Sequence, residues 1–368
     1  MNKISAKVIA ASENECGEKL VSMILTFPRF ILAELNTHRL FSRNSASSRA
    51  IPFKKMVQMA KEDPVIPIAW QAEHKGMQGS NYLEYEEDNE VLKRNWLHAR
   101  DYAVQFSTRL NEDHNVTKQL CNRLLEPFMW HTVLVTSSEW ENFFDLRTPS
   151  YYIDNVPTVD SNLESAGTVT LVSKSKKETL NNIGEIENSL YDDLRTILGN
   201  YTDLDWLKIN KGQAEIHMMA LGEAVYDAYN ECEFKQLSPG EWHIPFGGNM
   251  DQKMLEETLM SIYESSVTPP IEQRRLDFEH LKIQIATARC ARLSYITFDG
   301  KIDYLSDYNL YANLLQSGHW SPFEHCAKAM RKEDYDNYLI IEGGKVYPGW
   351  CRNFKGFIQL RALLDPHT

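Results

Sequence analysis

One continuous stretch, residues 27–51 (FPRFILAELNTHRLFSRNSASSRAI), constrains the fold of this chain more than any other. An apolar, β-branched run at residues 20–26 precedes it and predicts a strand, as does a similar run at residues 4–10. Pro28 suits the first turn of a helix, because the N–H that it lacks is not needed there. Apolar side chains then recur at helical spacing as far as Leu40, so we expect a strand that runs directly into an amphipathic helix.

The second half of this stretch is rich in hydrogen-bond donors. Between His38 and Arg49 it contains three arginines, a histidine, an asparagine and several serines. Guanidinium groups match the geometry of phosphate and carboxylate groups. A helix that leads into a donor-rich loop therefore indicates a site for an anionic ligand. A plain surface loop, whose basic residues stabilise a helix C-terminus, explains the same residues equally well.

The overall charge limits the partners of this donor-rich stretch. The 368 residues carry a formal net charge of −12 at pH 7. Such an acidic chain is a poor candidate for nucleic-acid binding, in which neutralisation of phosphates dominates the affinity. The cluster of Arg39, Arg43 and Arg49 is therefore local, and it favours a small anionic ligand over a polymer.

The cysteines and the apolar segments indicate a cytoplasmic protein. Six cysteines are scattered without a C-x-x-C pair, which is typical of reduced thiols and gives little support to a metal site. Residues 1–20 have no apolar core of a signal peptide. No apolar run is long enough to span a bilayer, so we expect no membrane partner.

A second group of candidate residues consists of Arg123 and Arg147. Arg147 ends a predicted helix, SEWENFFDLR, that Ser137 or Ser138 would cap and that also carries Asn142. Aromatic rings, an amide and a guanidinium on one helix suit a planar heterocycle. The alternative is two ordinary surface arginines beside an aromatic stripe that belongs to the core.

A third group is SPFEH at residues 321–325. Ser321 as N-cap, Pro322 in the first turn and Glu324 three residues after the cap predict a capping box. The N–H groups at such a helix start can bind an anion. Most capped helices bind nothing, however, and that interpretation stays open.

The rest of the chain predicts a single domain, residues 1–368, with three polar segments that look like insertions. These insertions cover residues 52–90, 148–210 and 235–280, and we expect little regular structure in the first of them. Further elements are expected at the following positions: helices at 91–110, 116–125, 183–198, 212–229, 255–265 and 303–316, and a strand at 130–136.

Together these groups resemble the flavin-dependent thymidylate synthases, also known as the thymidylate synthase complementing protein type. The family signature is Arg-His-Arg, seven residues and then Ser, and here Thr37-His38-Arg39 is followed after seven residues by Ser47. SEWENFFDLR resembles the family segment that carries a flavin-contacting Asn and a pyrimidine-contacting Arg. The blocks NRLLEP, QAEIHMMA, CARLSY and SGHWSPFEH are also similar to family blocks.

The order of the blocks differs from that of the family. Blocks like CARLSY and SPFEH normally precede the signature, whereas here they follow it at residues 290–325. The chain therefore looks circularly permuted, with large insertions. Permutation is physically tolerable when the ends of the fold lie close together at the surface.

The resemblance implies a fold and an activity. The fold is α/β (α+β), with a twisted, mainly antiparallel sheet flanked by helices. The enzyme would be a methyltransferase that reductively methylates dUMP to dTMP, with 5,10-methylenetetrahydrofolate as the carbon donor. FAD would carry the hydride and NADPH would reduce the FAD. Family members are homotetramers whose sites are built from several subunits, so a homo-oligomer is expected here.

The resemblance also assigns roles to residues. Arg147 would be catalytic, because it would stabilise negative charge that develops on the pyrimidine ring. His38, Arg147 and Ser321 would converge on one shared cleft. FAD would contact Thr37, His38, Arg39, Leu40, Ser45, Ser137, Ser138, Glu139, Asn142 and Ser321. The substrate would contact Glu34, Ser47, Ser48, Arg49, Arg123 and Arg147.

Three positions depart from the family pattern and keep alternatives open. Thr37 replaces a signature Arg, Glu34 stands near the nucleotide where the family has Gln, and Ser45 replaces a family Glu. Arg43 or Arg29 would restore the missing positive charge. One alternative is hydroxymethylation or methylation of another pyrimidine nucleotide by a related flavin- and folate-dependent enzyme. The other is a nucleotide-binding relative without catalysis.

Overall fold

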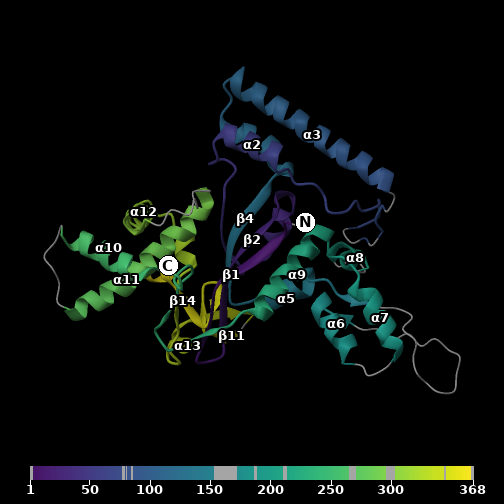
Figure 1. Cartoon of the computed structure of the whole chain (residues 1–368). Coiled ribbons are helices and arrows are strands. Elements are labelled where there is room, and N and C mark those ends of the chain that lie inside the picture. Colours follow the sequence, from purple (N-terminus) through teal and green to yellow (C-terminus); the bar gives the residue numbers. More distant parts are fainter. Residues whose placement is uncertain are drawn as a thin grey trace.

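A central five-stranded sheet organises the structure, a computed structural model (Figure 1). Its strand order is β3-β4-β2-β1-β7, antiparallel except for the parallel β1–β7 pair. The strands are β1 (Ser5–Asn14), β2 (Lys19–Pro28), β3 (Ser42–Ser45), β4 (Trp130–Ser137) and β7 (Lys235–Leu237). The described residues are 3–76, 79, 81–83, 86–152, 172–185, 189–209, 214–264, 271–295, 303–343 and 345–365. The expected α/β fold with a mainly antiparallel sheet is confirmed, as are the three predicted strands of this sheet.

The segment after Pro28 differs from the prediction. The expected helix to Leu40 is only a 3₁₀ turn, η1 (Arg29–Ile31), followed by one α-helical turn, α1 (Leu32–Leu35). Of the donor-rich residues that follow, Ser42–Ser45 form the edge strand β3, whereas residues 46–50 form the expected loop. This short segment still buries the apolar residues Ile31 and Leu35 in the core. Beyond Leu35 the chain forms backbone hydrogen bonds with the edge of β4. A longer helix could not form these bonds.

Each face of the sheet packs against different elements. On one face, α5 (Glu141–Arg147) and α9 (Ile216–Glu231) bury apolar side chains of β2 and β4. Because side chains alternate along a strand, Val133 and Val135 join this core, whereas Leu134 meets Cys290 of α11 (Ile271–Tyr295) on the other face. The edge strand β3 contacts α11 as well, so it joins the sheet to the C-terminal third of the chain.

A helical layer lies beyond one end of the sheet, at the top of Figure 1. It consists of α2 (Phe53–Glu62), α3 (Glu86–Glu112), α4 (Lys118–Cys121) and the 3₁₀ segment η2 (Asn122–Phe128). The expectation of little regular structure at residues 52–90 is therefore wrong for α2. Phe53, Met56 and Ala60 lie on one buried face of α2 and pack with Val104 and Leu125. That apolar spacing was the overlooked signal.

A second lobe contains the described part of residues 148–210. It consists of β5 (Tyr151–Tyr152), β6 (Val172–Ser173), α6 (Lys176–Gly184), α7 (Ser189–Gly199) and α8 (Asp203–Lys208). Its core is formed by Tyr151, Ile183, Leu198 and Trp206. Residues 153–171, 186–188 and 265–270 of the expected insertions lie outside the described residues, as does Gln213.

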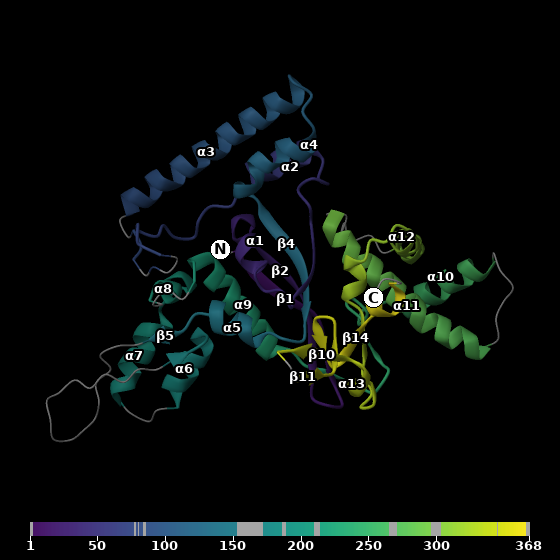
Figure 2. The ribbon, with the colours of Figure 1, turned by 180° about the vertical axis from the view of Figure 1, so that it is seen from behind.

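The C-terminal third of the chain lies beside the N-terminal strands, as Figures 1 and 2 show. Its helices α10 (Gln252–Glu264), α11 and α12 (Tyr304–Gln316) pack together. The remaining elements are the strands β8 (Trp242–His243), β9 (Ala327–Ala329), β10 (Leu339–Glu342), β11 (Lys345–Pro348), β12 (Trp350–Cys351), β13 (Phe354–Lys355) and β14 (Phe357–Gln359), the 3₁₀ turn η3 (Ser321–Glu324), and the helices α13 (Asp334–Asn337) and α14 (Leu360–Leu364). In the part of the chain that the structure describes, no helix is both long and apolar enough to cross a membrane.

Candidate functional site

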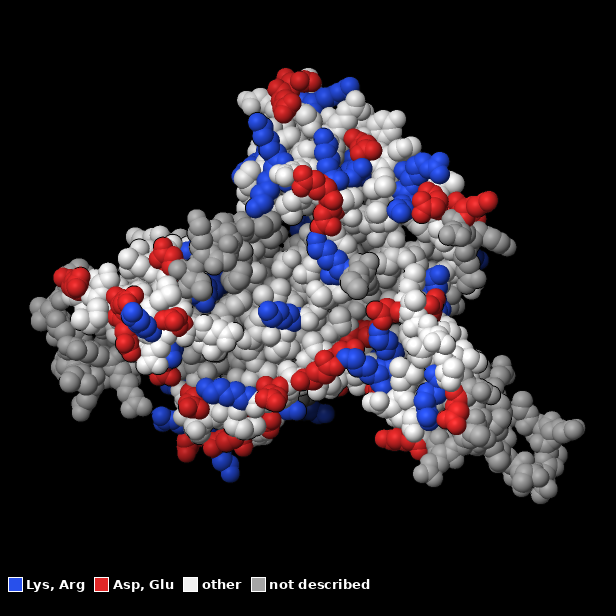
Figure 3. Space-filling model, viewed as in Figure 1, with Lys and Arg blue, Asp and Glu red and all other residues white. Residues whose placement is uncertain are grey.

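Strand β3 and the residues after it line an open cavity of about 480 Å³. Its polar groups are two guanidiniums, an imidazole, two amides and three hydroxyls, and no acidic side chain is among the described residues that line it. The lining residues are Arg43, Asn44, Ser45, Ser47, Arg49, Ala50, Gln119, His319 and Ser321. Acidic and basic side chains are interspersed over the face drawn in Figure 3. A cavity with cationic and hydroxyl donors, in a chain of net charge −12, has the donor set that suits an anionic ligand.

The segment after β3 separates this cavity from a second one of about 420 Å³. Ser45, Ser47 and Arg49 line the first cavity, whereas Ala46 and Ser48 line the second. The hydroxyl of Ser48 donates a hydrogen bond to the carboxylate of Glu126. The expected substrate-binding group of Ser47, Ser48 and Arg49 is thus divided between the two cavities at a turn, in which the N–H of Ala50 donates to the carbonyl oxygen of Ser47 at 3.0 Å.

His38 and Arg147 are in direct contact. Nε of Arg147 donates to Nε2 of His38 at 3.2 Å, and its Nη2 donates to Oγ1 of Thr37 at 3.4 Å. His38 is 6% exposed, and its ring stacks on Phe41 at 5.6 Å and meets Phe143 edge-on at 5.0 Å. Burial and the neighbouring guanidiniums of Arg147 and Arg43 lower the pKa of His38 to about 4, so the imidazole is neutral at pH 7.

Arg43 connects this pair to the cavity. Its Nη1 donates to the carbonyl oxygens of Leu35 at 3.4 Å and His38 at 3.5 Å, and Arg43 also lines the cavity with Ser321. Burial lowers the pKa of Arg43, and the negative charge of Glu324 opposes that shift.

Among the described residues, Ser321 lines a cavity that is apart from the contact between His38 and Arg147. Neither His38 nor Arg147 is among the described residues that line the cavity of Ser321. Among the described residues, Arg43 links the two groups, because it donates to the carbonyl oxygen of His38 and also lines the cavity. Arg29, the other candidate for replacing the missing charge, instead pairs with Glu126 at 3.2 Å.

The start of α5 also differs from the prediction. Trp140 is the N-cap residue, without a side-chain cap bond, so neither predicted serine caps this helix. Oγ of Ser137 accepts the N–H of Glu139 at 3.0 Å, and Oγ of Ser138 accepts the N–H of Lys355 at 2.9 Å. The chain turns between the end of β4 and the start of α5. The Ser137 hydroxyl stabilises this turn, and the Ser138 hydroxyl binds the strand that contains Lys355.

The other predicted site residues lie outside both groups. Arg39, Leu40, Arg123 and Asn142 are exposed. Glu34 is half-buried on α1, and its Oε2 has no hydrogen-bond partner among the described residues.

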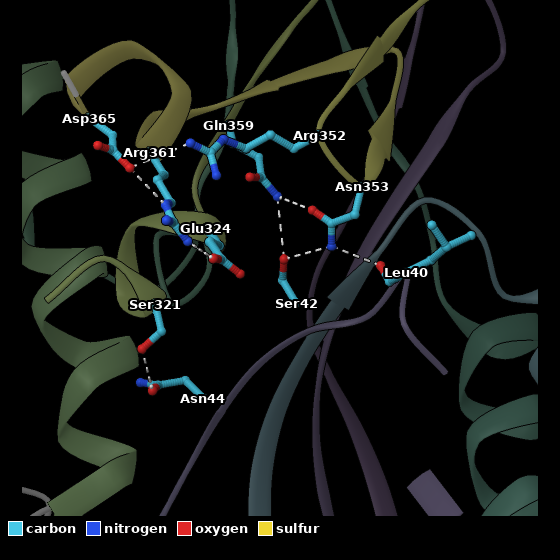
Figure 4. Close-up of polar contacts among 10 residues, drawn as sticks. All are labelled: Leu40, Ser42, Asn44, Ser321, Glu324, Arg352, Asn353, Gln359, Arg361 and Asp365. Atoms are coloured by element: carbon cyan, nitrogen blue, oxygen red, sulfur yellow. Dashed lines mark hydrogen bonds and ion pairs between the residues drawn. The ribbon is translucent and has the colours of Figure 1, made fainter. Parts of the chain in front are cut away.

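The C-terminal segment fastens β3 in a way that the sequence did not indicate (Figure 4). Nδ2 of Asn353 donates to the carbonyl oxygen of Leu40 at 2.9 Å and to Oγ of Ser42 at 3.0 Å. Nε2 of Gln359, which is fully buried, donates to Oγ of Ser42 at 3.3 Å and to Oδ1 of Asn353 at 2.7 Å. These amides hold the strand that presents Arg43 and Asn44 to the cavity.

The turn η3 approaches β3 from the same side (Figure 4). Ser321 and Glu324 do not form the predicted capping box, because η3 is a 3₁₀ turn without a side-chain cap bond. Instead, Oγ of Ser321 donates to Oδ1 of Asn44 at 3.3 Å, and Glu324 pairs with Arg361 at 2.6 Å. Both side chains thus bind residues that are distant in the sequence, and a local motif gives no information about such partners.

A buried chain of hydroxyls and histidines joins the sheet to the C-terminal third. Ser12 Oγ contacts Nδ1 of His243 at 2.9 Å, and Nε2 of His243 contacts Ser22 Oγ at 2.9 Å. Ser22 contacts Thr136 at 2.6 Å, and Thr136 contacts Nδ1 of His325 at 2.8 Å. Burial lowers the pKa of both histidines to about 3, so both are neutral at pH 7.

The structure is a mixed α/β fold with a cavity rich in cationic and hydroxyl donors, and comparisons with known proteins add the following. No protein-family profile matches the sequence, and no curated protein sequence matches it. Solved structures with partial similarity include the UMP/dUMP methylase PolB from Streptomyces cacaoi bound with 5-bromo-UMP (14% identity, 42% of this chain, 80% of that chain, TM-score 0.32). The same methylase bound with 5-bromo-dUMP is 15% identical over 45% of this chain and 83% of that chain (TM-score 0.31). Thymidylate synthase X from Helicobacter pylori with FAD and dUMP is 14% identical over 50% of this chain and 74% of that chain (TM-score 0.24).

Proposed function

We propose that this protein is a flavin-dependent enzyme that reductively methylates dUMP to dTMP. The carbon would come from 5,10-methylenetetrahydrofolate, with FAD as cofactor and NADPH as reductant. The observation that carries the proposal is the cavity beside β3, where guanidiniums and hydroxyls gather on the strand that follows the signature-like residues Thr37-His38-Arg39. The sequence blocks that resemble the flavin-dependent thymidylate synthases support the same reaction.

The donor set fits phosphate-bearing ligands. FAD and dUMP both carry phosphate, and charge-assisted hydrogen bonds from guanidiniums are the strong contacts for such groups. Arg49 and Ser47 would hold the substrate phosphate, and Ser45 and Ser321 would hold FAD. Arg43 would supply the positive charge that Thr37 lacks relative to the family signature, because it is held beside His38 and lines the cavity.

The pair of His38 and Arg147 suits the pyrimidine ring. C5 of uracil is a weak nucleophile, so a cation at the ring edge must stabilise the negative charge that develops there. Two of the five N–H donors of Arg147 are used on His38 and Thr37, and the remaining donors would face the pyrimidine. The neutral imidazole fixes the guanidinium without repelling it. Reduced flavin, when bound, supplies the hydride.

Assembly would complete the site. The exposed residues Arg39, Leu40, Arg123 and Asn142 would meet ligands across subunit interfaces of a homotetramer built from single-domain, cytoplasmic chains of residues 1–368. Light scattering of the purified protein measures that state directly. A stable monomer that is fully active would contradict this part of the proposal.

One preparation tests the reaction. The absorption spectrum of the purified protein should show bound flavin, and the colour should bleach with NADPH. Mass analysis of products from dUMP and from dCMP, with methylenetetrahydrofolate present, should then show dTMP from dUMP alone. A hydroxymethylated product, or a product from dCMP, would replace the proposed reaction with a related one. Nucleotide binding without flavin and without product would refute enzymatic activity.

A further inference from the structure

Helix α9 approaches the end of α5 unusually closely at Gly222. A Cβ atom on Gly222 would lie 2.4 Å from the carbonyl oxygen of Arg147, 2.6 Å from its carbonyl carbon and 2.9 Å from the N atom of Thr148. All three are backbone atoms, so no side chain can rotate away to make room. Gly222 lies inside a helix, where glycine costs roughly 0.5–1 kcal/mol relative to alanine. The close approach therefore gives a physical reason for glycine at this position.

Glu223, the next residue of α9, forms a second contact with the segment that follows Arg147. Oε1 of Glu223 accepts the hydroxyl of Tyr151 at 3.0 Å and the N–H of Lys176 at 3.3 Å. Tyr151 is fully buried and packs edge-on against Trp206 at 5.0 Å. The chain that follows Arg147 is thus held to α9 at residues 147–148 and again at residue 151.

This double attachment determines where the guanidinium of Arg147 can lie. Arg147 is the last residue of α5, and its Nε is 3.2 Å from Nε2 of His38. A methyl group at position 222 would have to push the Arg147 carbonyl oxygen from 2.4 Å to the 3.4 Å of ordinary contact, a move of about 1 Å. A displacement of that size breaks a hydrogen bond of 3.2 Å unless the side chain compensates.

We propose that Gly222 is a positioning residue: by lacking a side chain, it lets α9 set the backbone of Arg147 and thereby holds the guanidinium against His38. This inference rests on the proposed function, in which Arg147 contacts the pyrimidine. Its structural content, the contact between Arg147 and His38, can be measured without any turnover.

The tautomer of His38 reports that contact. Arginine only donates hydrogen bonds, so Nε2 of His38 must accept and the proton of the neutral ring must reside on Nδ1. If Arg147 withdraws, the proton is free to occupy Nε2. The nitrogen chemical shifts of ¹⁵N-labelled histidine distinguish the two tautomers at neutral pH, and a His38→Gln variant assigns the signal.

The experiment compares two glycine-to-alanine changes in the full chain. Gly222→Ala should shift His38 away from the Nδ1–H tautomer, and it should lower the turnover number on the order of 100-fold, as expected for a misplacement of about 1 Å. Gly184→Ala is the matched control, because nothing lies within 4 Å of a Cβ atom at that helix position. It should leave both the tautomer and the turnover unchanged. A Gly222→Ala variant with the wild-type tautomer would overturn the proposal.

A second variant keeps the proposal testable if Gly222→Ala does not fold. Tyr151→Phe removes only the hydroxyl that joins this segment to Glu223, and it should move the tautomer equilibrium of His38 in the same direction to a smaller extent. An unchanged tautomer in that variant would then overturn the proposal. If the wild-type protein makes no dTMP, the proposed function fails, whereas the tautomer measurement still decides the positioning role on its own.

Discussion

Acidification should destabilise the fold through His243 and His325. These side chains are 1% and 0% exposed, and they join the central sheet to the C-terminal third through Ser12, Ser22 and Thr136. Burial lowers the pKa of each to about 3, whereas an unfolded histidine titrates near 6.5. Both are therefore neutral in the folded protein at pH 7, and their protonation favours the unfolded chain.

The sign and the magnitude follow from linkage. Between pH 3 and 6.5 the unfolded chain binds more protons than the folded chain, so the free energy of unfolding rises with pH in that window. A change from about pH 7.5 to about pH 5.5 should lower it by roughly 1.4 kcal/mol for each histidine. The pair therefore contributes a loss of roughly 3 kcal/mol, a large share of the stability of a typical domain.

Urea denaturation at the two pH values measures this loss. The double variant His243→Gln, His325→Gln cannot titrate at these positions, so its free energy of unfolding should fall by roughly 3 kcal/mol less than that of the wild type. The exposed His98, changed to Gln, serves as the control and should keep the wild-type pH dependence. Carboxylates contribute equally to all three proteins, so they cancel in the comparison. If the double variant loses as much stability as the wild type, the reasoning is refuted.

Five single changes test the site and its support. Arg147→Ala should abolish product formation in the dUMP assay while flavin absorbance persists, and an active variant would remove its proposed role. Arg39→Ala or His38→Ala should lower the FAD content per chain after gel filtration, and an unchanged content would count against a flavin contact. Arg43→Gln should weaken dUMP binding in calorimetry by roughly 1.5–3 kcal/mol, because a charge-assisted hydrogen bond is lost; equal affinity would exclude this arginine from the site. Ser42→Ala should destabilise the chain by roughly 1–3 kcal/mol in urea denaturation, because the buried amide of Gln359 and the half-buried amide of Asn353 lose an acceptor, and an unchanged midpoint would contradict that account.

Local sequence patterns were sufficient to predict those helices and strands whose apolar residues recur regularly over the whole element. The strands at residues 20–26 and 130–136 and the helix at residues 91–110 were predicted, because each carries its apolar pattern over its full length. The pattern after Pro28 was predicted as a longer helix than the structure contains. There, a few buried apolar residues were compatible with a short turn, and pairing with β4 decided the outcome.

Some residues of the candidate site could be predicted from the sequence, whereas others could be found only in the structure. The donors of residues 43–49 are visible as a cluster in the sequence, and the structure gathers most of them around one cavity. The amides of Asn353 and Gln359 could not be linked to Ser42, because more than 300 residues separate them from it. Gly222 gives no sequence signal at all, since its importance depends on which backbone passes beside it.

The sequence by itself determined three strands of the central sheet, β1, β2 and β4, together with the acidic net charge of the chain and the local concentration of arginines and hydroxyls after residue 37. These properties follow from composition and short-range periodicity, which depend only on neighbouring residues. Only the tertiary structure decided that alternate residues after β3 face two different cavities, and that Arg147 lies against a neutral His38. Both outcomes depend on strand pairing and helix packing between distant segments, for which a linear sequence contains no local signal.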